Sequence, residues 1–105
     1  MLHAKMKGTL GELKVTSELI KKGYAVFTEV GDLSRIDLIA WKDDKLIKIQ
    51  VKSLASKNGS IEIHNYKSGP NYRYKYTKED VDIFAIYSPE LDEVFYISIN
   101  EILKR

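Results

Sequence analysis

The chain has 105 residues, no cysteine and a formal net charge of +2. This length suits one domain around one core, so residues 1–105 are expected to form a single domain. Disulfides and thiolate metal sites are excluded, and no apolar run approaches the roughly 18 residues of a membrane span. Residues 1–7 lack the apolar segment of a signal peptide, so the sequence predicts a cytoplasmic, intracellular protein with no membrane partner.

The charges are unevenly distributed along the chain. Residues 35–78 hold ten Lys or Arg against four Asp or Glu, whereas residues 79–105 hold two against seven. A basic face beside an acidic one suits an anionic polymer such as nucleic acid. A solvated, lysine-rich surface would give the same counts, and charge alone leaves both interpretations open.

The first predicted element is an amphipathic helix over residues 8–22, which ends at Gly23, a residue favoured just after a helix. Helical spacing places its apolar residues on one broad arc: Leu10, Leu13, Val15, Leu19 and Ile20. Glu12 falls inside this arc. A carboxylate there is an anomaly, because its desolvation is costly unless it has a partner.

A first strand over residues 24–30 is followed by a predicted β-hairpin, with strands over residues 35–41 and 45–53. The hairpin turns at an acidic pair, which is typical turn chemistry, and facing residue numbers then sum to 87. In this register Asp37 faces Gln50 directly, and Lys52 is a diagonal neighbour on the same side.

Further elements are predicted in the second half of the chain. They are a short strand over residues 59–64, a loop over residues 65–76 rich in Tyr and basic residues, and a helix-capping pattern from Thr77 to Asp80. Strands over residues 82–88 and 93–99 and a helix from about Asn100 complete the chain. A helix, an antiparallel meander, further strands and a C-terminal helix indicate an α/β or α+β fold.

Three kinds of polar group converge in this arrangement. The carboxylates of Glu12 and Asp37 and the amide of Gln50 offer oxygen ligands that suit Mg²⁺, with Mn²⁺ as a substitute. The ion would lower the pKa of a bound water, and Lys52 would orient the nucleophile or stabilise developing negative charge. The alternatives are a structural Glu12–Lys52 salt bridge, a turn cap at Asp37, and a tolerated polar strand residue at Gln50.

These residues resemble the motif of the PD-(D/E)-x-K nuclease superfamily over roughly residues 8–88: Asp37, then Gln50-Val51-Lys52, with Glu12 matching the helix carboxylate of many members. Ile36 replaces the Pro of the motif, and Gln50 replaces its acidic residue. The Gln-x-Lys form is most similar to archaeal-type Holliday junction resolvases and to group I intron homing endonucleases of this fold.

The resemblance implies a restriction-endonuclease-like core in which Asp37, Gln50 and the Val51 carbonyl bind metal with help from Glu12. Lys52 would serve catalysis. The implied activity is that of a Mg²⁺-dependent DNA endonuclease, a hydrolase acting on phosphodiester bonds. Cutting two strands needs two sites, so a homodimer is expected, with a tetramer as the alternative.

A chain this short has little surface for reading a long sequence, so cleavage selective for branched DNA is preferred over site-specific, homing-type cleavage of a duplex. The residues expected to contact DNA are basic, hydroxyl-bearing or aromatic: Ser34, Arg35, Lys48, Lys67, Tyr72, Arg73, Tyr74 and Lys75.

Other interpretations remain open. Gln50 favours a catalytically silent nuclease-fold module that only binds DNA. The Tyr-rich segment could bind RNA, or it could form an edge strand with Tyr on the core and the cations in water.

Overall fold

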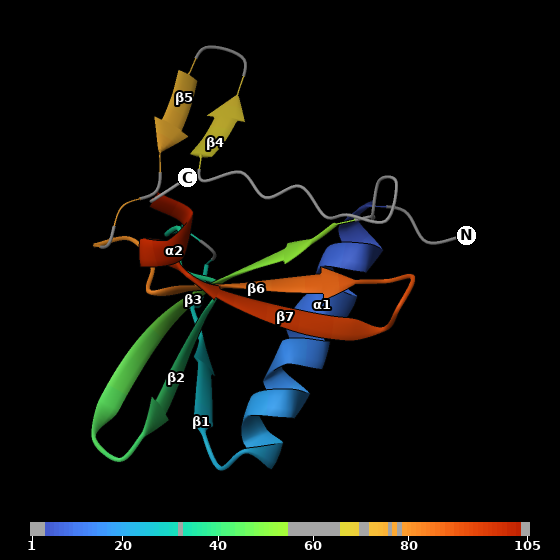
Figure 1. The fold of residues 1–105 in the computed structure, drawn as a ribbon, viewed down its shortest axis with the longest axis vertical. Coiled ribbons are helices and arrows are strands. Elements are labelled where there is room, and N and C mark those ends of the chain that lie inside the picture. Colours follow the sequence, from blue (N-terminus) through green and yellow to red (C-terminus); the bar gives the residue numbers. More distant parts are fainter. Residues whose placement is uncertain are drawn as a thin grey trace.

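The computed structural model describes residues 4–31, 33–54, 66–69, 72–75, 77 and 79–103. Its elements are α1 (Ala4–Lys21), β1 (Ala25–Thr28), β2 (Leu38–Lys42), β3 (Lys45–Ser53), β4 (Tyr66–Gly69), β5 (Tyr72–Lys75), β6 (Ile83–Ser88), β7 (Glu93–Ser98) and α2 (Ile99–Leu103). One sheet has the strand order β1-β2-β3-β6-β7, and β4 pairs with β5 in a second sheet (Figure 1). The predicted α+β class is confirmed. None of the helices described is long and apolar enough to cross a membrane.

Helix α1 starts one turn before its predicted beginning and ends where the sequence predicts. Gly23 has a φ of 94°, which a residue with a side chain rarely adopts. The Gly23 N–H donates to the Ile20 carbonyl at 2.9 Å, and the Tyr24 N–H donates to the Leu19 carbonyl at 3.0 Å. These two bonds form a Schellman motif, which stops the helix and directs the chain into β1.

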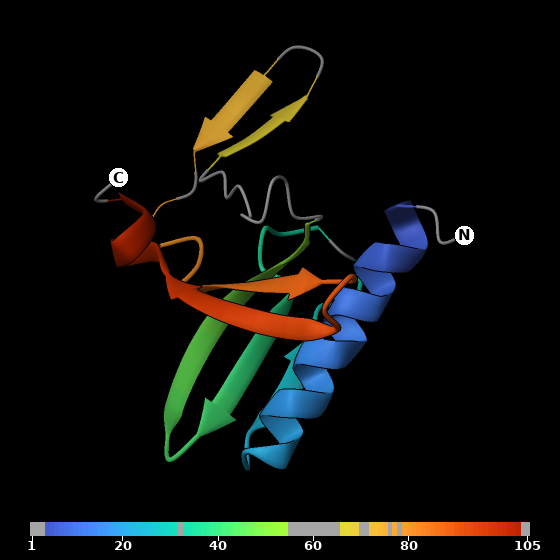
Figure 2. The ribbon, with the colours of Figure 1, turned by 45° about the vertical axis from the view of Figure 1, so that its right-hand side comes forward.

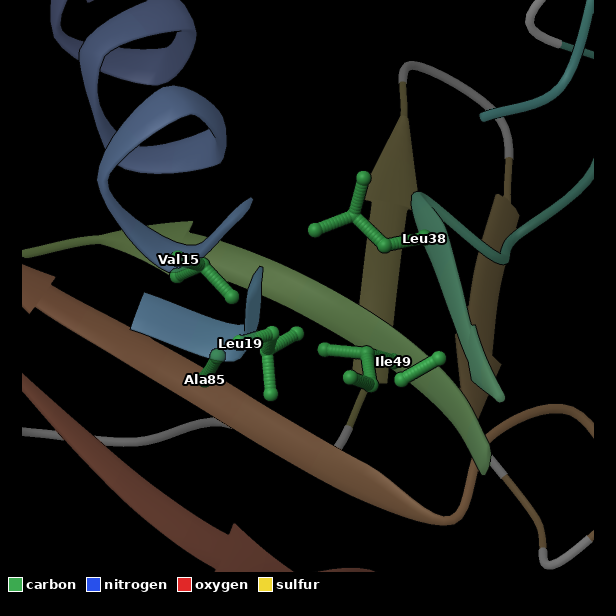
Figure 3. Packing of buried hydrophobic residues seen from close by; sticks show 6 residues of the cluster. Val15, Leu19, Leu38, Ile49 and Ala85 are labelled. Carbon is green, nitrogen blue, oxygen red and sulfur yellow. The ribbon is translucent and has the colours of Figure 1, made fainter. Parts of the chain in front are cut away.

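The side of α1 that packs on the sheet is narrower than the sequence predicts. Gly11, Val15 and Leu19 are buried there, and Figure 3 shows Val15 and Leu19 over the strand residues Leu38, Ile49 and Ala85.

The rest of the predicted apolar arc is not part of the core. Leu10, Leu13 and Ile20 are 39%, 61% and 57% exposed, so the prediction of one broad core face was wrong. The physical reason is helical geometry: at 3.6 residues per turn, Val15 and Leu19 lie on the side of α1 opposite to Leu13, so both groups cannot face the sheet.

The β2–β3 hairpin has the predicted register. Asp43 and Asp44 have φ values of 52° and 61°, as the tight turn of a two-residue hairpin requires. Lys42 pairs with Lys45, and the ladder continues to the pair of Leu38 with Ile49.

Strand β6 is parallel to β3, and Gln50 pairs with Phe84 in that ladder. On the face of the sheet away from α1, a second core cluster contains Val81, Phe84, Ile86 and Ile99. The sheet is therefore buried on both faces, and α2 contributes Ile99 to the second one.

The predicted strand over residues 59–64 lies outside the described residues. The predicted loop over residues 65–76 was wrong, because it contains β4 and β5, paired from Tyr66↔Lys75 to Gly69↔Tyr72. Alternating aromatic residues favour a strand, and here they outweigh Gly and Pro.

The capping pattern predicted from Thr77 to Asp80 forms, since the Thr77 N–H donates to Asp80 Oδ2 at 2.9 Å. Residues 79–80 nevertheless form a turn instead of a helix.

Candidate active site

The ladder between β2 and β3 changes register at Asp37. The Asp37 N–H donates to the Ile49 carbonyl at 3.0 Å, although Leu38 is already the partner of Ile49. Two residues therefore oppose one, as in a β-bulge. The direct pairing of Asp37 with Gln50, expected from strict alternation, is replaced by this shift of one residue.

The bulge brings the Asp37 carboxylate to the backbone of Val51. Asp37 Oδ2 accepts a hydrogen bond from the Val51 N–H at 2.8 Å. The N–H and C=O of a strand residue point to the same edge, so the Val51 carbonyl is also directed to this side of β3. Two of the predicted metal ligands, a carboxylate and a main-chain carbonyl, are thereby brought to one place just beyond the first residue of β2.

Gln50 has an unusual environment for a strand residue. Its side chain is half-buried, and its Oε1 atom is buried without a hydrogen-bond partner among the residues described. A buried amide oxygen without a donor is costly, and such groups in folded proteins mark the position of a missing partner or ion. A cation would satisfy this acceptor.

Lys52 lies two residues after Gln50, on the same side of β3. It is half-buried, and its Nζ atom lies 5.7 Å from the centroid of the Phe84 ring. An ammonium group in such partly desolvated surroundings acts more strongly on a nearby anion than one in water.

Helix α1 reaches the same end of β3 at Gly11. A Cβ atom on Gly11 would lie 2.5 Å from Ser53 Oγ and 3.4 Å from Val51 Cγ1, so a side chain here would have to displace the Ser53 hydroxyl. The Ser53 hydroxyl donates to the Lys7 carbonyl at 2.8 Å and fastens the strand to the helix. Glu12, the next residue along α1, is half-buried. The motif pointed to Glu12, but sequence reasoning missed the glycine that brings its helix here.

The donor set fits a hard divalent cation through its oxygen atoms. The described residues contain no group of three or more His, Cys, Asp or Glu side chains that could hold a metal. The predicted set has only two carboxylates, Glu12 and Asp37, and takes its other oxygens from an amide and a main-chain carbonyl. Oxygen ligands of this kind suit Mg²⁺, and the unsatisfied Gln50 Oε1 atom is the observation that fits it.

Ser34, predicted to contact a phosphate, organises the loop that precedes Asp37. The Glu29 carboxylate accepts bonds from the Ser34 N–H and the Ser34 hydroxyl, both at 2.8 Å, and from the Leu33 N–H at 3.1 Å. The bond from the Ser34 amide is the main cause that lowers the pKa of Glu29. The sequence analysis missed this role of Glu29. A contact of Ser34 or of the exposed Arg35 with a DNA phosphate stays a prediction.

Lys48 lies in the first half of β3 and holds the segment before β6. Its ammonium donates to the Glu79 carbonyl at 2.5 Å, and its N–H donates to Asp82 Oδ2 at 2.8 Å. These contacts show that Lys48 stabilises the segment before β6, and its contact with DNA stays a prediction.

The other predicted DNA-binding residues all fall in one hairpin, made of β4 and β5: Lys67, Tyr72, Arg73, Tyr74 and Lys75. In its register Lys67 pairs with Tyr74, and Arg73 pairs with Ser68.

Comparisons with known proteins bear on the family and the fold of the chain. A family profile described as PD-(D/E)XK endonuclease matches residues 2–104. Protein 5.3 of Escherichia phage T7 is 29% identical over 86 residues, which are 81% of this chain and 73% of that protein. The structure of a bacterial homing endonuclease, I-Ssp6803I, matches 99% of this chain and 74% of its own with a TM-score of 0.85 and 24% identity. At that identity the likeness shows the fold, and the predicted restriction-endonuclease-like core is confirmed.

Proposed function

The chain belongs to the PD-(D/E)XK endonuclease family, and from this membership we propose that it hydrolyses phosphodiester bonds of DNA with a bound divalent ion, Mg²⁺ or its substitute Mn²⁺. The observation that supports this most is the buried Gln50 Oε1 atom without a partner. It lies in the strand that carries Lys52, next to the residue whose N–H holds the Asp37 carboxylate.

Asp37, Gln50 and the Val51 carbonyl, with Glu12, would hold the ion. When bound, a divalent cation supplies a water of lowered pKa and neutralises charge on the phosphate. The Val51 N–H already orients the Asp37 carboxylate, as hydrogen-bonded partners of metal ligands do. Because Gln50 is neutral where the family motif is acidic, the site carries one negative charge fewer, and weaker metal binding follows.

Lys52 acts on the reacting phosphate in this proposal. Its ammonium orients the attacking water or stabilises the charge that develops in the transition state. The Phe84 ring beneath it restricts the positions that the flexible side chain can adopt. A positioned cation of this kind is worth about 10² to 10³ in rate.

The first proposed substrate is branched DNA, for the reason of size given above. A second candidate, cleavage at a specific duplex site, is favoured by the β4–β5 hairpin, which stands away from the main sheet in Figures 1 and 2. The major groove of B-DNA admits a two-stranded ribbon, and this hairpin includes Lys67, Arg73 and Lys75. The structurally similar protein is named as a homing endonuclease, which is in keeping with the second candidate. For either substrate, cutting both strands requires two sites, and a homodimer supplies them.

The direct test offers three DNA substrates: a linear duplex, a supercoiled plasmid and a four-way junction, each with Mg²⁺ and with EDTA. We expect cleavage that requires the ion. A preference for the junction supports the first candidate, and cuts at one fixed plasmid position support the second. Cleavage that persists in EDTA would contradict the metal-dependent mechanism.

Calorimetric titration with Mn²⁺ separates an active nuclease from a silent DNA-binding module. Asp37→Asn should abolish the binding heat and the cleavage together. Asp44→Asn is the matched control, because it makes the same change at the opposite end of the hairpin, in a positive-φ turn that Asn tolerates. No binding heat in the unchanged protein, together with no cleavage of any substrate, would refute the proposal.

A further inference from the structure

Helix α1 has a second apolar side, directed away from the sheet. Met6, Leu10, Leu13 and Ile20 are 45%, 39%, 61% and 57% exposed. Together with Ser17 they follow each other at alternating spacings of four and three residues. This is the spacing of the seam along which one helix packs against another. In Figure 2, α1 lies at the edge of the molecule, with the sheet on one side and no described element on the other.

The seam is not an extension of the core. Gly11, Val15 and Leu19 face the sheet, and at 3.6 residues per turn they lie on the side of α1 opposite to Leu10 and Leu13. The outer side of a surface helix is normally polar. Contacts among the described residues of one copy therefore leave the seam pattern unexplained.

We infer that the seam, defined by Met6, Leu10, Leu13, Ser17 and Ile20, pairs in parallel with the same seam of a second copy of this chain. An apolar stripe with this spacing is complementary to another helix that carries the same stripe. A copy of α1 meets that requirement without any further partner.

The charges beside the seam favour the parallel orientation. One flank carries Lys7 and Lys21, with Lys14 between them paired with Asp92 of its own copy at 3.2 Å, and the other carries Thr9 and Thr16. In a parallel pair each flank faces the opposite flank of the partner helix, so lysine meets threonine. An antiparallel pair would set lysine against lysine, which is repulsive.

The parallel orientation also places the two candidate active sites at one end of the dimer. Gly11, in the N-terminal half of α1, approaches the end of β3 that carries Gln50 and Lys52. When two such helices run side by side in the same direction, both of these strand ends lie at the same end of the pair. This consequence rests on the proposed function, which needs two sites on one DNA molecule, whereas the seam does not depend on it.

Sedimentation measures the association directly. The unchanged protein should form a dimer, and Leu13→Glu should weaken it by about a hundredfold, because a carboxylate would be buried without a partner. Leu46→Glu is the matched control, since Leu46 is 65% exposed in the hairpin but lies off the seam. Unchanged protein that stays monomeric up to about 1 mM, or equal dimers in both variants, would overturn the inference.

Engineered cysteines test the orientation and do not depend on how well Leu13→Glu folds. The chain has no cysteine, so each variant carries a single thiol. In the parallel pair position 17 lies opposite itself within disulfide reach, and Ser17→Cys should form a covalent dimer on mild oxidation.

Thr28→Cys, at an exposed position on β1, is the control for random oxidation. Ser17→Cys that crosslinks no better than this control would overturn the pairing. Efficient crosslinking only in a mixture of Leu13→Cys with Ser17→Cys would show an antiparallel pair and overturn the orientation. None of these measurements uses DNA cleavage, so their failure is separate from a failure of the proposed function.

Discussion

The two halves of β3 differ in the way their backbone is paired. From Lys45 to Ile49 the strand pairs residue by residue with β2, and its polar side chains are lysines. From Gln50 to Ser53 it continues past the first residue of β2 and stays paired with β6. The second half contains Gln50 and Lys52, which are both half-buried. The Gln50 Oε1 atom is the only side-chain acceptor among the described residues that is buried and has no hydrogen-bond partner.

The difference shows at which position of a sheet a set of metal ligands can form. In the first half the ladder uses the main-chain groups directed at β2. In the second half the Val51 N–H needs another acceptor, and the bulge at Asp37 supplies a carboxylate. A ligand set can form at this position because the regular ladder has ended.

The largest expected effect is a loss of DNA cleavage on substitution in the second half of β3 and not in the first. Lys52→Met keeps the apolar stem over Phe84 and removes the ammonium, so cleavage should fall by about 10² to 10³. Binding of DNA should stay within a few-fold, because one cation among several contacts contributes little to affinity. Lys45→Met, at the exposed start of the same strand, should leave cleavage unchanged.

Single-turnover cleavage and equilibrium binding, measured on the same DNA, give both quantities. If binding and cleavage fell equally in Lys52→Met, Lys52 would be holding the DNA or the fold, and the contrast between the halves would fail.

A second prediction concerns the close approach of α1 to the second half of β3. In Gly11→Ala the new Cβ would overlap Ser53 Oγ, so we expect a loss of about 1 to 3 kcal/mol in the free energy of unfolding. Gly8→Ala has nothing within 4 Å of the new atom and should stabilise the helix by about 1 kcal/mol. Urea unfolding of both variants measures the two changes, and a stable Gly11→Ala would show that the contact is loose.

A smaller effect is expected beside the first half of β3. Tyr96, in a pocket of about 150 Å³ that Ile47 and Ile49 also line, donates its hydroxyl to Glu18 Oε1 at 3.0 Å. Burial, and then this hydrogen bond, hold the pKa of Tyr96 above its ordinary value. The stability that this pKa shift contributes is complete below about pH 10, the unfolded value, and is lost as the pH rises toward the folded one.

Tyr96→Phe should therefore flatten the fall in stability above about pH 10 while cleavage at neutral pH stays unchanged. Urea midpoints taken across that range test the first part. A loss of cleavage in Tyr96→Phe would mean that the first half of β3 also belongs to the site.

Much of the fold was predictable because local signals agreed with it. The acidic turn fixed the register of the β2–β3 hairpin, and Gly23 ended α1 as expected. The bulge at Asp37 was not predictable, since strict alternation carries no sign of an extra residue. The packing side of α1 was also missed, because the apolar residues were taken as one arc. Helical spacing already places Val15 and Leu19 on the side of α1 opposite to Leu13.

The candidate site was predictable where it depends on side-chain chemistry. Asp37, Gln50 and Lys52 were conspicuous as polar groups inside apolar runs. Glu29 was not, because its partners are main-chain N–H groups of a loop whose shape only the fold determines. The β4–β5 hairpin was missed because Gly and Pro in its sequence indicated a loop.

Thermal melts of Gln50→Glu, with and without Mg²⁺, test the central claim that the second half of β3 holds a metal ion. The change replaces a neutral oxygen ligand by an anionic one of nearly the same volume. Without the ion, the new carboxylate close to Asp37 should lower the melting temperature through like-charge repulsion. With Mg²⁺ the variant should gain more stability than the unchanged protein, and it should cleave DNA at a lower concentration of the ion. A variant that melts lower than the unchanged protein and gains nothing from Mg²⁺ would contradict the claim.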